Sequence, residues 1–367
     1  MTDPRARAWK EIDLDTLAHN ARVLQDLLHP GCRLMAVVKA DAYGHGAVPA
    51  ARRLAREGVT AFAVACLDEG ITLRRAGVQG MILILGYTPP EAVPLLVRWG
   101  VTQTVADEAH GRALNAAGRR LSVHLALDTG MRRLGVSAED LRALHRLYGM
   151  ENLNITGVFS HLCVSDSPNP SDRDYTQGQL ERFYRAVDRL RRGGHDPGEI
   201  HIRASGGILN LPPQPCSYAR AGIALYGAGG GSDLRPVLSL RARIACIRTL
   251  APGERAGYGL DFQAVRETRL AVVTVGYGDG LPRALCRLGG RALVNGRSCP
   301  MAGRMCMDQL LLDVTDVPRA LPGQAVTLIG QEAGQRIQVE EIAQACGTIP
   351  NEVLCQLGGR LGLVLRQ

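Results

Sequence analysis

The first two thirds of the chain alternate short apolar runs with segments of helical periodicity. Short apolar runs bounded by turn residues are typical of buried parallel strands, and apolar positions three or four apart are typical of helices that cover a sheet. The runs lie at residues 34–38, 61–65, 81–85, 101–105, 121–127, 155–160, 199–204 and 217–221. Helical patterns precede the first run at residues 14–28 and follow most of the others, for example at residues 47–57, 68–76, 107–117 and 173–192.

Eight strand-then-helix units over about 230 residues match the size of a (β/α)8 barrel. The alternative is an open doubly wound sheet, which needs a glycine-rich dinucleotide turn after its first strand. This sequence has no such turn after residues 34–38. We therefore predict an α/β fold with a TIM-like barrel over residues 1–234.

After about Arg235 the pattern changes to short strand-like runs separated by glycine and proline, as at residues 251–253 and 321–323. Such spacing is typical of antiparallel strands joined by tight turns. The runs lie at residues 236–249, 269–276, 291–294, 309–314 and 325–330. We predict a second, mostly β domain over residues 235–367.

Composition narrows the class of protein. The net charge of +8 comes from arginines spread along helices, as in residues 182–192, and aromatic residues make up only 4% of the chain, so we expect no nucleic-acid binding. The sequence contains neither an apolar run long enough for a membrane span nor a secretory signal at residues 1–7. The ten cysteines are scattered without Cys-x-x-Cys pairs, which predicts no metal site and a cytoplasmic protein.

Lysine is rare in this chain, and its position is informative. Of the 43 basic residues, two are lysines, Lys10 and Lys39, and Lys39 directly follows the first apolar run. A lysine amine can form a Schiff base with a carbonyl, whereas arginine cannot. Lys39 is therefore a candidate for covalent carbonyl chemistry, although a solvated lysine just beyond a strand is the alternative.

Polar residues follow several predicted strands at the carboxyl-terminal face, where barrel enzymes carry their active sites. Loops after the seventh and eighth strands commonly bind phosphate with backbone amides. A Schiff-base lysine beside a phosphate site indicates pyridoxal 5′-phosphate. Taken singly, these residues have ordinary explanations, as a buried histidine, an ion-paired arginine or a turn glycine, and their joint placement is the signal. The candidates are Lys39, His161, Ser205, Arg220, Gly222 and Ile223.

Several longer segments resemble the alanine racemase family of fold-type III pyridoxal-phosphate enzymes. The resemblance runs nearly from end to end, with the motifs in the same order. It is carried by residues 11–15, 37–46, 128–135, 220–227, 257–259, 276–280 and 303–309.

The resemblance implies a two-base racemase that interconverts L-alanine and D-alanine. Lys39 would hold the cofactor as an aldimine and act as the base on the D-face. Tyr258, from the second domain of the partner subunit, would act on the L-face, because racemisation needs proton donors and acceptors on both sides of Cα. The implied assembly is a two-fold homodimer with composite active sites, and the implied role is the supply of D-alanine for peptidoglycan.

The same resemblance assigns the remaining site residues. It implies that the substrate carboxylate is bound by Arg133 and by the backbone of Met307, and that Tyr277 lines the substrate entrance. Arg220 would meet the pyridine nitrogen, where a guanidinium disfavours protonation, and His161 would support the Arg220–Tyr258 network. The implied phosphate ligands are Tyr43, Ser205, Gly222 and Ile223.

Ala126 is a first departure from the family pattern. Family members usually carry a lysine there, modified to a carbamate that orients the carboxylate-binding arginine, and alanine cannot do this. Arg133 must then be held by a bound anion, by water or by a neighbouring acid, and of these we favour the anion. Arg132, in place of a usual glycine, adds positive charge nearby.

Asn351 is a second departure, at a point where alanine-specific members have a tyrosine. Asparagine is smaller and carries an amide donor and acceptor, so it leaves room for a CH2OH group and can hydrogen-bond it. The serine-racemase branch linked to vancomycin resistance resembles this feature, which makes a serine or broad-specificity racemase the alternative. A second possibility is that Pro350 simply rearranges the loop.

Other classes fit less well. A non-catalytic pyridoxal-phosphate-binding protein is usually a lone barrel, and the second domain with Tyr258 argues against it. Decarboxylases of the same architecture usually place a glutamate at the pyridine nitrogen, where this chain has Arg220. A non-enzymatic interaction protein would leave the residues around Lys39 unexplained.

Overall fold

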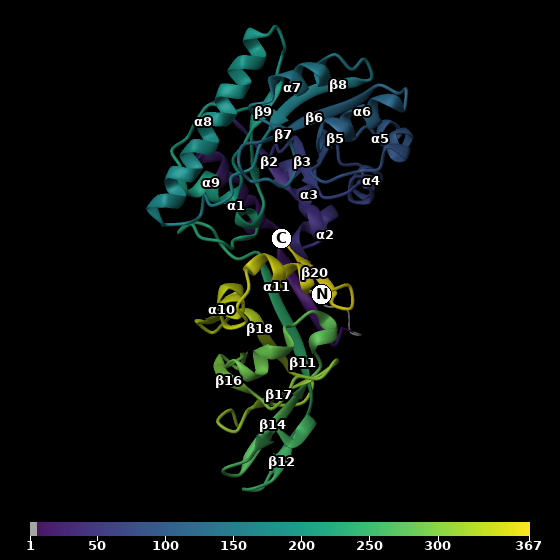
Figure 1. Cartoon of the computed structure of the whole chain (residues 1–367). Coiled ribbons are helices and arrows are strands. Elements are labelled where there is room, and N and C mark those ends of the chain that lie inside the picture. Colours follow the sequence, from purple (N-terminus) through teal and green to yellow (C-terminus); the bar gives the residue numbers. More distant parts are fainter. Residues whose placement is uncertain (1–5) are drawn as a thin grey trace. The chain divides into compact units, whose positions relative to one another are not determined.

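The computed structural model describes residues 6–367, which form two compact units (Figure 1). The barrel unit comprises residues 17–42 and 47–234, and the β unit comprises residues 6–16, 43–46 and 235–367. No helix within residues 6–367 combines the length and apolar character that crossing a bilayer demands.

The barrel unit contains eight parallel strands in one sheet, as the apolar runs predict, in the order β10-β2-β3-β4-β5-β6-β8-β9. The sheet nearly closes on itself, because the Arg220 amide donates to the Arg203 carbonyl at 3.0 Å and Ala204 bridges Arg220. The strands are β2 (Arg33–Val37), β3 (Ala61–Val64), β4 (Met81–Ile84), β5 (Thr102–Val105), β6 (Leu121–Asp128), β8 (Leu153–Phe159), β9 (Glu199–His201) and β10 (Tyr218–Ala221), with the short β7 (Val136–Ser137) beside β6.

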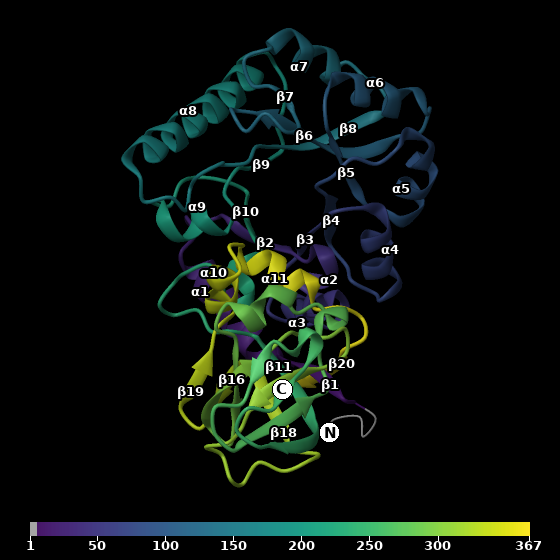
Figure 2. The same ribbon diagram turned by 60° about the horizontal axis from the view of Figure 1, so that its bottom comes forward.

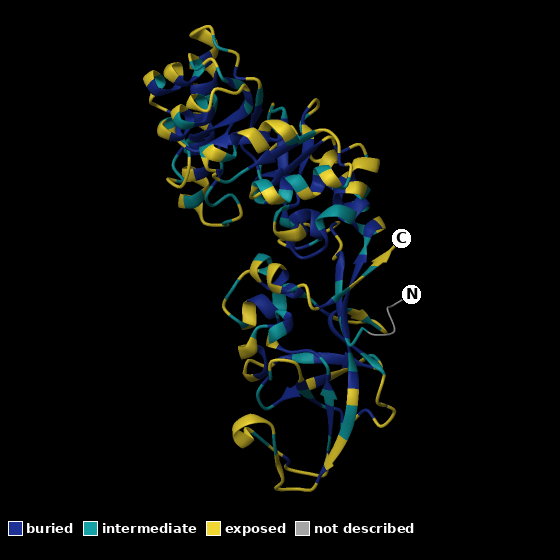
Figure 3. Cartoon of the chain, turned by 90° about the vertical axis from the view of Figure 1, so that its right-hand side faces the viewer, coloured by how far each residue is buried: buried dark blue, intermediate teal, exposed yellow. Residues whose placement is uncertain are grey.

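Helices surround these strands, and the strands form the buried layer (Figures 2 and 3). The sequence favours a helix start at Pro170, where the longest helix, α8 (Pro170–Arg192), begins. The Asn169 side chain caps it by accepting from the Ser171 amide, and Pro170 occupies the first helical position. The helices along this part of the chain are α1 (Leu14–Asp26), α2 (Lys39–Tyr43), α3 (Ala47–Arg56), α4 (Leu67–Arg75), α5 (Val93–Trp99), α6 (Glu108–Ala116), α7 (Leu141–Tyr148), α8 (Pro170–Arg192) and α9 (Ser205–Asn210), with 3-10 turns η1 (Pro90–Ala92) and η2 (Ile223–Tyr226).

The β unit is built on a nine-stranded sheet in the order β19-β18-β15-β16-β17-β14-β11-β1-β20. The sequence pattern does not predict β1 (Ala8–Asp13), which pairs antiparallel with β11 and parallel with β20. The other strands are β11 (Leu238–Leu250), β14 (Thr268–Val273), β15 (Arg291–Val294), β16 (Arg297–Ala302), β17 (Leu310–Asp313), β18 (Ala325–Glu332), β19 (Gln335–Ile337) and β20 (Gly362–Arg366). A separate hairpin joins β12 (Arg255–Ala256) to β13 (Phe262–Gln263), and the helical segments are η3 (Tyr258–Leu260), η4 (Tyr277–Asp279), η5 (Arg283–Arg287), α10 (Val339–Ala345) and α11 (Pro350–Gln356).

Candidate active site

Lys39 begins an unusual turn just after β2. Residues 40–43 all adopt left-handed backbone conformations, with φ between 51° and 55°, and none of them is glycine. Left-handed helical geometry costs roughly 1–2 kcal/mol per L-residue, so contacts elsewhere must hold the turn. The turn fixes the backbone from which the Lys39 amine projects.

Two carboxylates hold this turn through backbone amides. Glu69 accepts from the Ala40 amide with Oε1 and from the Ala65 amide with Oε2, both at 2.7 Å. Asp41 accepts from the Ala47 amide, also at 2.7 Å, at the start of α3. Charged acceptors on backbone donors are among the stronger hydrogen bonds, and here they offset the strain of the turn.

Arg220, in β10, is buried with 3% of its surface exposed and is held on several sides. Its Nη1 donates to His201 Nδ1 at 2.6 Å, and its Nη2 donates to His161 Nδ1 at 3.1 Å and to the Ser160 carbonyl at 2.7 Å. Its guanidinium carbon lies 5.2 Å from the ring centre of Phe159. The orientation of the guanidinium is therefore set before any ligand arrives.

These contacts decide the protonation of the neighbouring imidazoles. Arginine only donates, so Nδ1 of both His161 and His201 must accept, and each neutral ring carries its proton on Nε2. His201 Nε2 can then donate to His124 Nδ1, 2.9 Å away. Burial lowers the pKa of His161 to about 3, and the charges of Arg220, Arg133 and Lys39 add to this effect. The barrel mouth thus gathers positive charge around a neutral imidazole.

The buried histidines predict a loss of stability in mild acid. Burial holds the pKa of His124 and of His161 at about 3 in the folded protein, aided by Arg220, whereas unfolded histidine titrates near pH 6.5. The unfolded chain therefore binds more protons between pH 6.5 and pH 3, so this stability is complete above pH 6.5 and is lost as the pH falls. We expect the free energy of unfolding, from urea denaturation, to fall by about 2 kcal/mol per histidine between pH 6.5 and pH 5.

Carboxylates with ordinary pKa values near 4 titrate mainly below this window, so the histidines dominate it. An unfolding free energy that stays constant between pH 6.5 and pH 5 would contradict the prediction.

Ser205 and Gly222 bring two short helical segments together. Ser205 opens α9 after β9, and its hydroxyl oxygen accepts from the amides of Gly222 at 3.0 Å and of Ala224 at 3.3 Å. Ile223 lies between these two amides at the start of η2. A hydroxyl among backbone amides at the carboxyl ends of β9 and β10 is a donor set suited to a phosphate group.

The residues of the barrel unit fit pyridoxal phosphate. An amine for the aldehyde, a guanidinium for the ring nitrogen and a hydroxyl with amides for the phosphate all lie at the carboxyl ends of strands of one sheet, and three positive charges suit an anionic cofactor. Seven of the residues that the sequence singles out belong to this barrel unit, namely Lys39, Arg133, His161, Ser205, Arg220, Gly222 and Ile223.

The departure at Ala126 leaves a small, buried side chain in β6, opposite Phe159 of β8. Arg133 is exposed in the loop that follows β6, and within residues 6–367 its guanidinium makes no hydrogen bond or ion pair. Arg132 takes a left-handed conformation with φ of 55°, and its amide donates to Asp128 at 3.0 Å. That an anion holds Arg133 stays a prediction.

The other five predicted site residues belong to the β unit. Tyr43 is buried there, and burial raises the pKa of its phenol. Tyr258 opens η3 and Tyr277 opens η4, with 68% and 39% of their surfaces exposed. Met307, 51% exposed, lies between β16 and β17. Asn351 is the second residue of α11, whose first position is Pro350, so this proline begins a helix.

Sequence reasoning missed three residues that support the site. Glu69 holds the turn after Lys39, and His201 and His124 extend the contacts of Arg220. His201 lies inside the predicted strand 199–204 between Ile200 and Ile202, which are buried like it, and a histidine between apolar residues of a strand was the available signal. Nothing in the sequence near Glu69 distinguishes it from an ordinary surface carboxylate.

A (β/α)8 barrel with this lysine and arginine pair, followed by a β-sheet unit, defines a pyridoxal-phosphate-dependent amino-acid racemase. Comparison with known families agrees with this class. Residues 12–229 match the alanine racemase N-terminal domain, and residues 237–365 match the alanine racemase C-terminal domain. The chain belongs to the alanine racemase family.

Individual relatives support the same assignment. The chain is 40% identical to an alanine racemase of Desulfovibrio desulfuricans, over 96% of both chains. It is 37% identical to an amino-acid racemase of Enterococcus faecalis, over 98% of this chain and 52% of that protein, so it spans about half the length of that relative. The solved alanine racemase of Clostridium difficile 630 matches with a TM-score of 0.93 and 32% identity, over 99% of this chain and 97% of that one.

Proposed function

We propose that this racemase interconverts L-alanine and D-alanine by a two-base mechanism. The observation that carries the proposal is the joint position of Lys39, on its strained turn, and Arg220, held by two neutral histidines, at the carboxyl ends of barrel strands. When bound, pyridoxal phosphate would stabilise the negative charge that develops on Cα as its proton leaves.

Two residues would move the protons. Lys39 would accept or return the Cα proton on the face of D-alanine, and Tyr258 would do so on the face of L-alanine. We propose that residues 235–367 of one subunit contribute Tyr258 to the barrel (residues 1–234) of its partner, which makes the active form a two-fold homodimer. The 68% exposure of Tyr258 in this single chain supports a role completed by a second copy.

Binding groups would orient the substrate and cofactor. Arg133 and the backbone of Met307 would hold the carboxylate, and Tyr277 would line the entrance. Arg220 would meet the pyridine nitrogen and, because it only donates, keep that nitrogen unprotonated, with His161 supporting it. Burial and the charge of Arg133 lower the pKa of Arg220 to about 9, so it stays charged at neutral pH. The phosphate would be held by Tyr43, Ser205, Gly222 and Ile223.

The test is a chiral assay of the cofactor-loaded protein with L-alanine and L-serine side by side. Conversion of L-alanine to a nearly equal mixture of enantiomers supports the proposal, and turnover of neither amino acid overturns it. The family role, supply of D-alanine for peptidoglycan, would be tested by rescue of a D-alanine auxotroph.

A serine or broad-specificity racemase is the second candidate. Asn351 favours it, because this residue is partly exposed near the start of α11 and offers an amide where a tyrosine would fill space. The similarity to an amino-acid racemase of Enterococcus faecalis points in the same direction. Faster turnover of L-serine than of L-alanine would select this function.

Replacing Asn351 with tyrosine is expected to lower the serine-to-alanine ratio of kcat/KM by at least about tenfold. A site that hydrogen-bonds a substrate hydroxyl discriminates strongly, whereas an apolar pocket rejects an added hydroxyl by only about 10²-fold. The ratio is measured with both substrates on one enzyme preparation. An unchanged ratio would exclude Asn351 as the specificity determinant, and Glu352→Gln, next to it on α11, serves as the control.

A further inference from the structure

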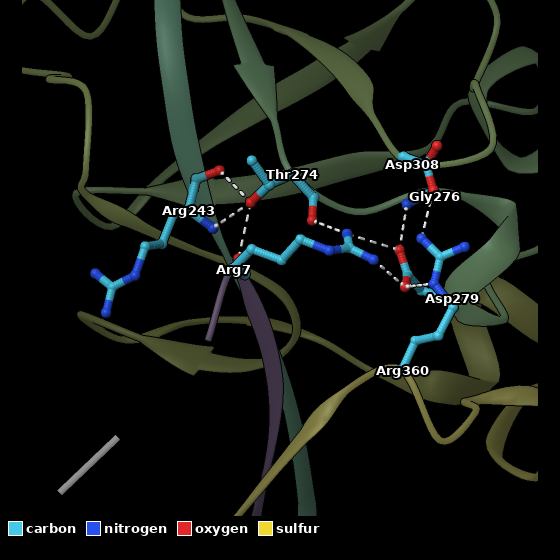
Figure 4. A network of polar contacts seen from close by, with 7 residues as sticks. All are labelled: Arg7, Arg243, Thr274, Gly276, Asp279, Asp308 and Arg360. Atoms are coloured by element: carbon cyan, nitrogen blue, oxygen red, sulfur yellow. Dashed lines mark hydrogen bonds and ion pairs between the residues drawn. The ribbon is translucent and has the colours of Figure 1, made fainter. Parts of the chain in front are cut away.

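The β unit contains a buried carboxylate, Asp279, that the proposed mechanism does not use. It is the last residue of η4, the 3-10 turn that Tyr277 opens, and none of its surface is exposed. An isolated buried charge is costly, so its partners must compensate for it. Figure 4 shows those partners arriving from several parts of the chain.

Two arginines and a backbone amide satisfy Asp279. Arg7 binds it with both terminal nitrogens, at 2.6 Å and 3.1 Å, and also donates to the Thr274 carbonyl at 2.5 Å. Arg360 Nε lies 3.2 Å from Oδ1, and the Gly276 amide donates to Oδ2 at 3.0 Å (Figure 4). Such paired contacts fix the orientation of the carboxylate as well as neutralising it.

The turn closed by Asp279 is joined directly to the loop that carries Met307. The Tyr277 amide donates to the Cys306 carbonyl at 3.2 Å, and the Gly278 amide donates to the Met307 carbonyl at 2.8 Å. A Cβ on Gly276 would lie 2.3 Å and 2.5 Å from these two carbonyl oxygens, so the segments approach as closely as glycine allows.

Arg360 extends the same connection. Besides Asp279, it contacts the carboxylate of Asp308, the residue that follows Met307 (Figure 4). The Gly358 amide donates to the Asp279 carbonyl at 3.1 Å, just beyond the end of α11. Asp279 therefore joins three segments, carrying Tyr277, Met307 and α11.

We infer that Asp279, with Arg360, is a positioning residue that sets the Tyr277 turn and the Met307 backbone in the geometry needed to admit and orient the substrate carboxylate. This inference rests on the proposed function, in which Tyr277 and Met307 face the substrate. Asp279 itself is fully buried, so it acts through those two residues. The alternative is that the network only stabilises the β unit.

The first variant is Asp279→Asn, which keeps the size of the side chain and removes its charge. We expect KM for the faster of L-alanine and L-serine to rise about tenfold while kcat changes less than about threefold, because binding contacts are loosened before the chemical step. Circular dichroism and the thermal midpoint are recorded on the same preparations. A lower midpoint with unchanged KM would show a purely structural role and overturn the inference.

A second pair of variants decides the matter if Asp279→Asn does not fold. Arg360 is partly exposed, and Arg360→Gln removes its contacts with Asp279 and Asp308. Asp279 remains in place, so Arg7 keeps its partner and no buried arginine is left unpaired. Arg360→Gln should raise KM about threefold to tenfold, whereas Arg360→Lys, which keeps the charge but not the fork that reaches both Asp279 and Asp308, should recover part of that loss. Equal KM values for wild type and Arg360→Gln would overturn the inference.

Asp316→Asn is the matched control, because Asp316 pairs with Arg266 at 2.7 Å on the surface of the same unit and joins none of the three segments. It should leave KM and kcat unchanged. If wild-type protein is active and the Asp279 and Arg360 variants behave like this control, the positioning role alone fails. If wild-type protein racemises neither substrate, the proposed function fails and the inference falls with it.

Discussion

Replacing Lys39 with alanine is expected to reduce racemisation about 10³-fold or more while the protein stays folded. The amine supplies both the covalent attachment of the cofactor and one of the two proposed bases, and each is a large contribution to rate. The contacts that hold its turn use backbone amides, with Glu69 and Asp41 as acceptors, so they survive loss of the side chain. The measurement is the initial rate of D-alanine formation at saturating pyridoxal phosphate.

The other lysine of the chain, Lys10, serves as the control for the Lys39 variant. Lys10 Nζ donates to the carbonyls of Gly44 at 2.6 Å and Leu357 at 3.2 Å inside the β unit, so it has a structural explanation. The Lys10→Arg variant should remain active. Borohydride reduction of the cofactor-loaded protein should label Lys39, and label found on Lys10 would contradict the assignment.

Replacing Tyr258 with phenylalanine is expected to slow racemisation in both directions by about 10²- to 10⁴-fold, the usual contribution of a general acid or base. The variant keeps Lys39, the base on the face of D-alanine, so exchange of the Cα proton with solvent should be lost for L-alanine only. In D2O, the variant should still exchange the Cα proton of D-alanine through Lys39, without forming L-alanine. Exchange into L-alanine should fall with the racemisation rate.

Mass spectrometry after chiral separation reads both exchanges in one sample. Tyr87→Phe provides the control, since Tyr87 is likewise exposed, at 55% of its surface, and lies in the barrel unit. Racemisation by Tyr258→Phe at the wild-type rate would remove Tyr258 from the mechanism, and loss of exchange on both faces would argue against separate bases.

The sequence predicts the elements of the barrel because each of its strand-and-helix units follows the same short-range pattern of apolar and polar residues. Parallel strands buried on both faces must be apolar, and the covering helices must be amphipathic, so both are legible from short windows of sequence. The run at residues 61–65, for example, becomes β3 (Ala61–Val64). The sequence pattern did not predict β1, because the strands that pair with it, β11 and β20, lie more than two hundred residues away along the chain.

The candidate site also combines features that short stretches of sequence reveal with contacts between residues far apart in the chain. The lysine after the first strand and the arginine of the last are visible in the sequence because each sits at a strand end. Their supports are not visible, since Glu69 reaches Ala40 across 29 residues and His124 reaches His201 across 77. Sequence carries no local mark of which distant acceptor will meet a given donor.

By itself, then, the sequence determined the order of the barrel strands and the presence of candidate residues such as Lys39 and Arg220 at their ends, because periodicity and strand ends are local properties. The candidates of the second domain, such as Tyr258, came from the resemblance to the alanine racemase family. The tertiary structure decided what those residues can do. It placed residues 40–43 in a left-handed turn, made His161 an acceptor beside Arg220, and joined Arg7 to Asp279 across 272 residues. Strain, protonation and buried charge depend on neighbours that only folding brings together.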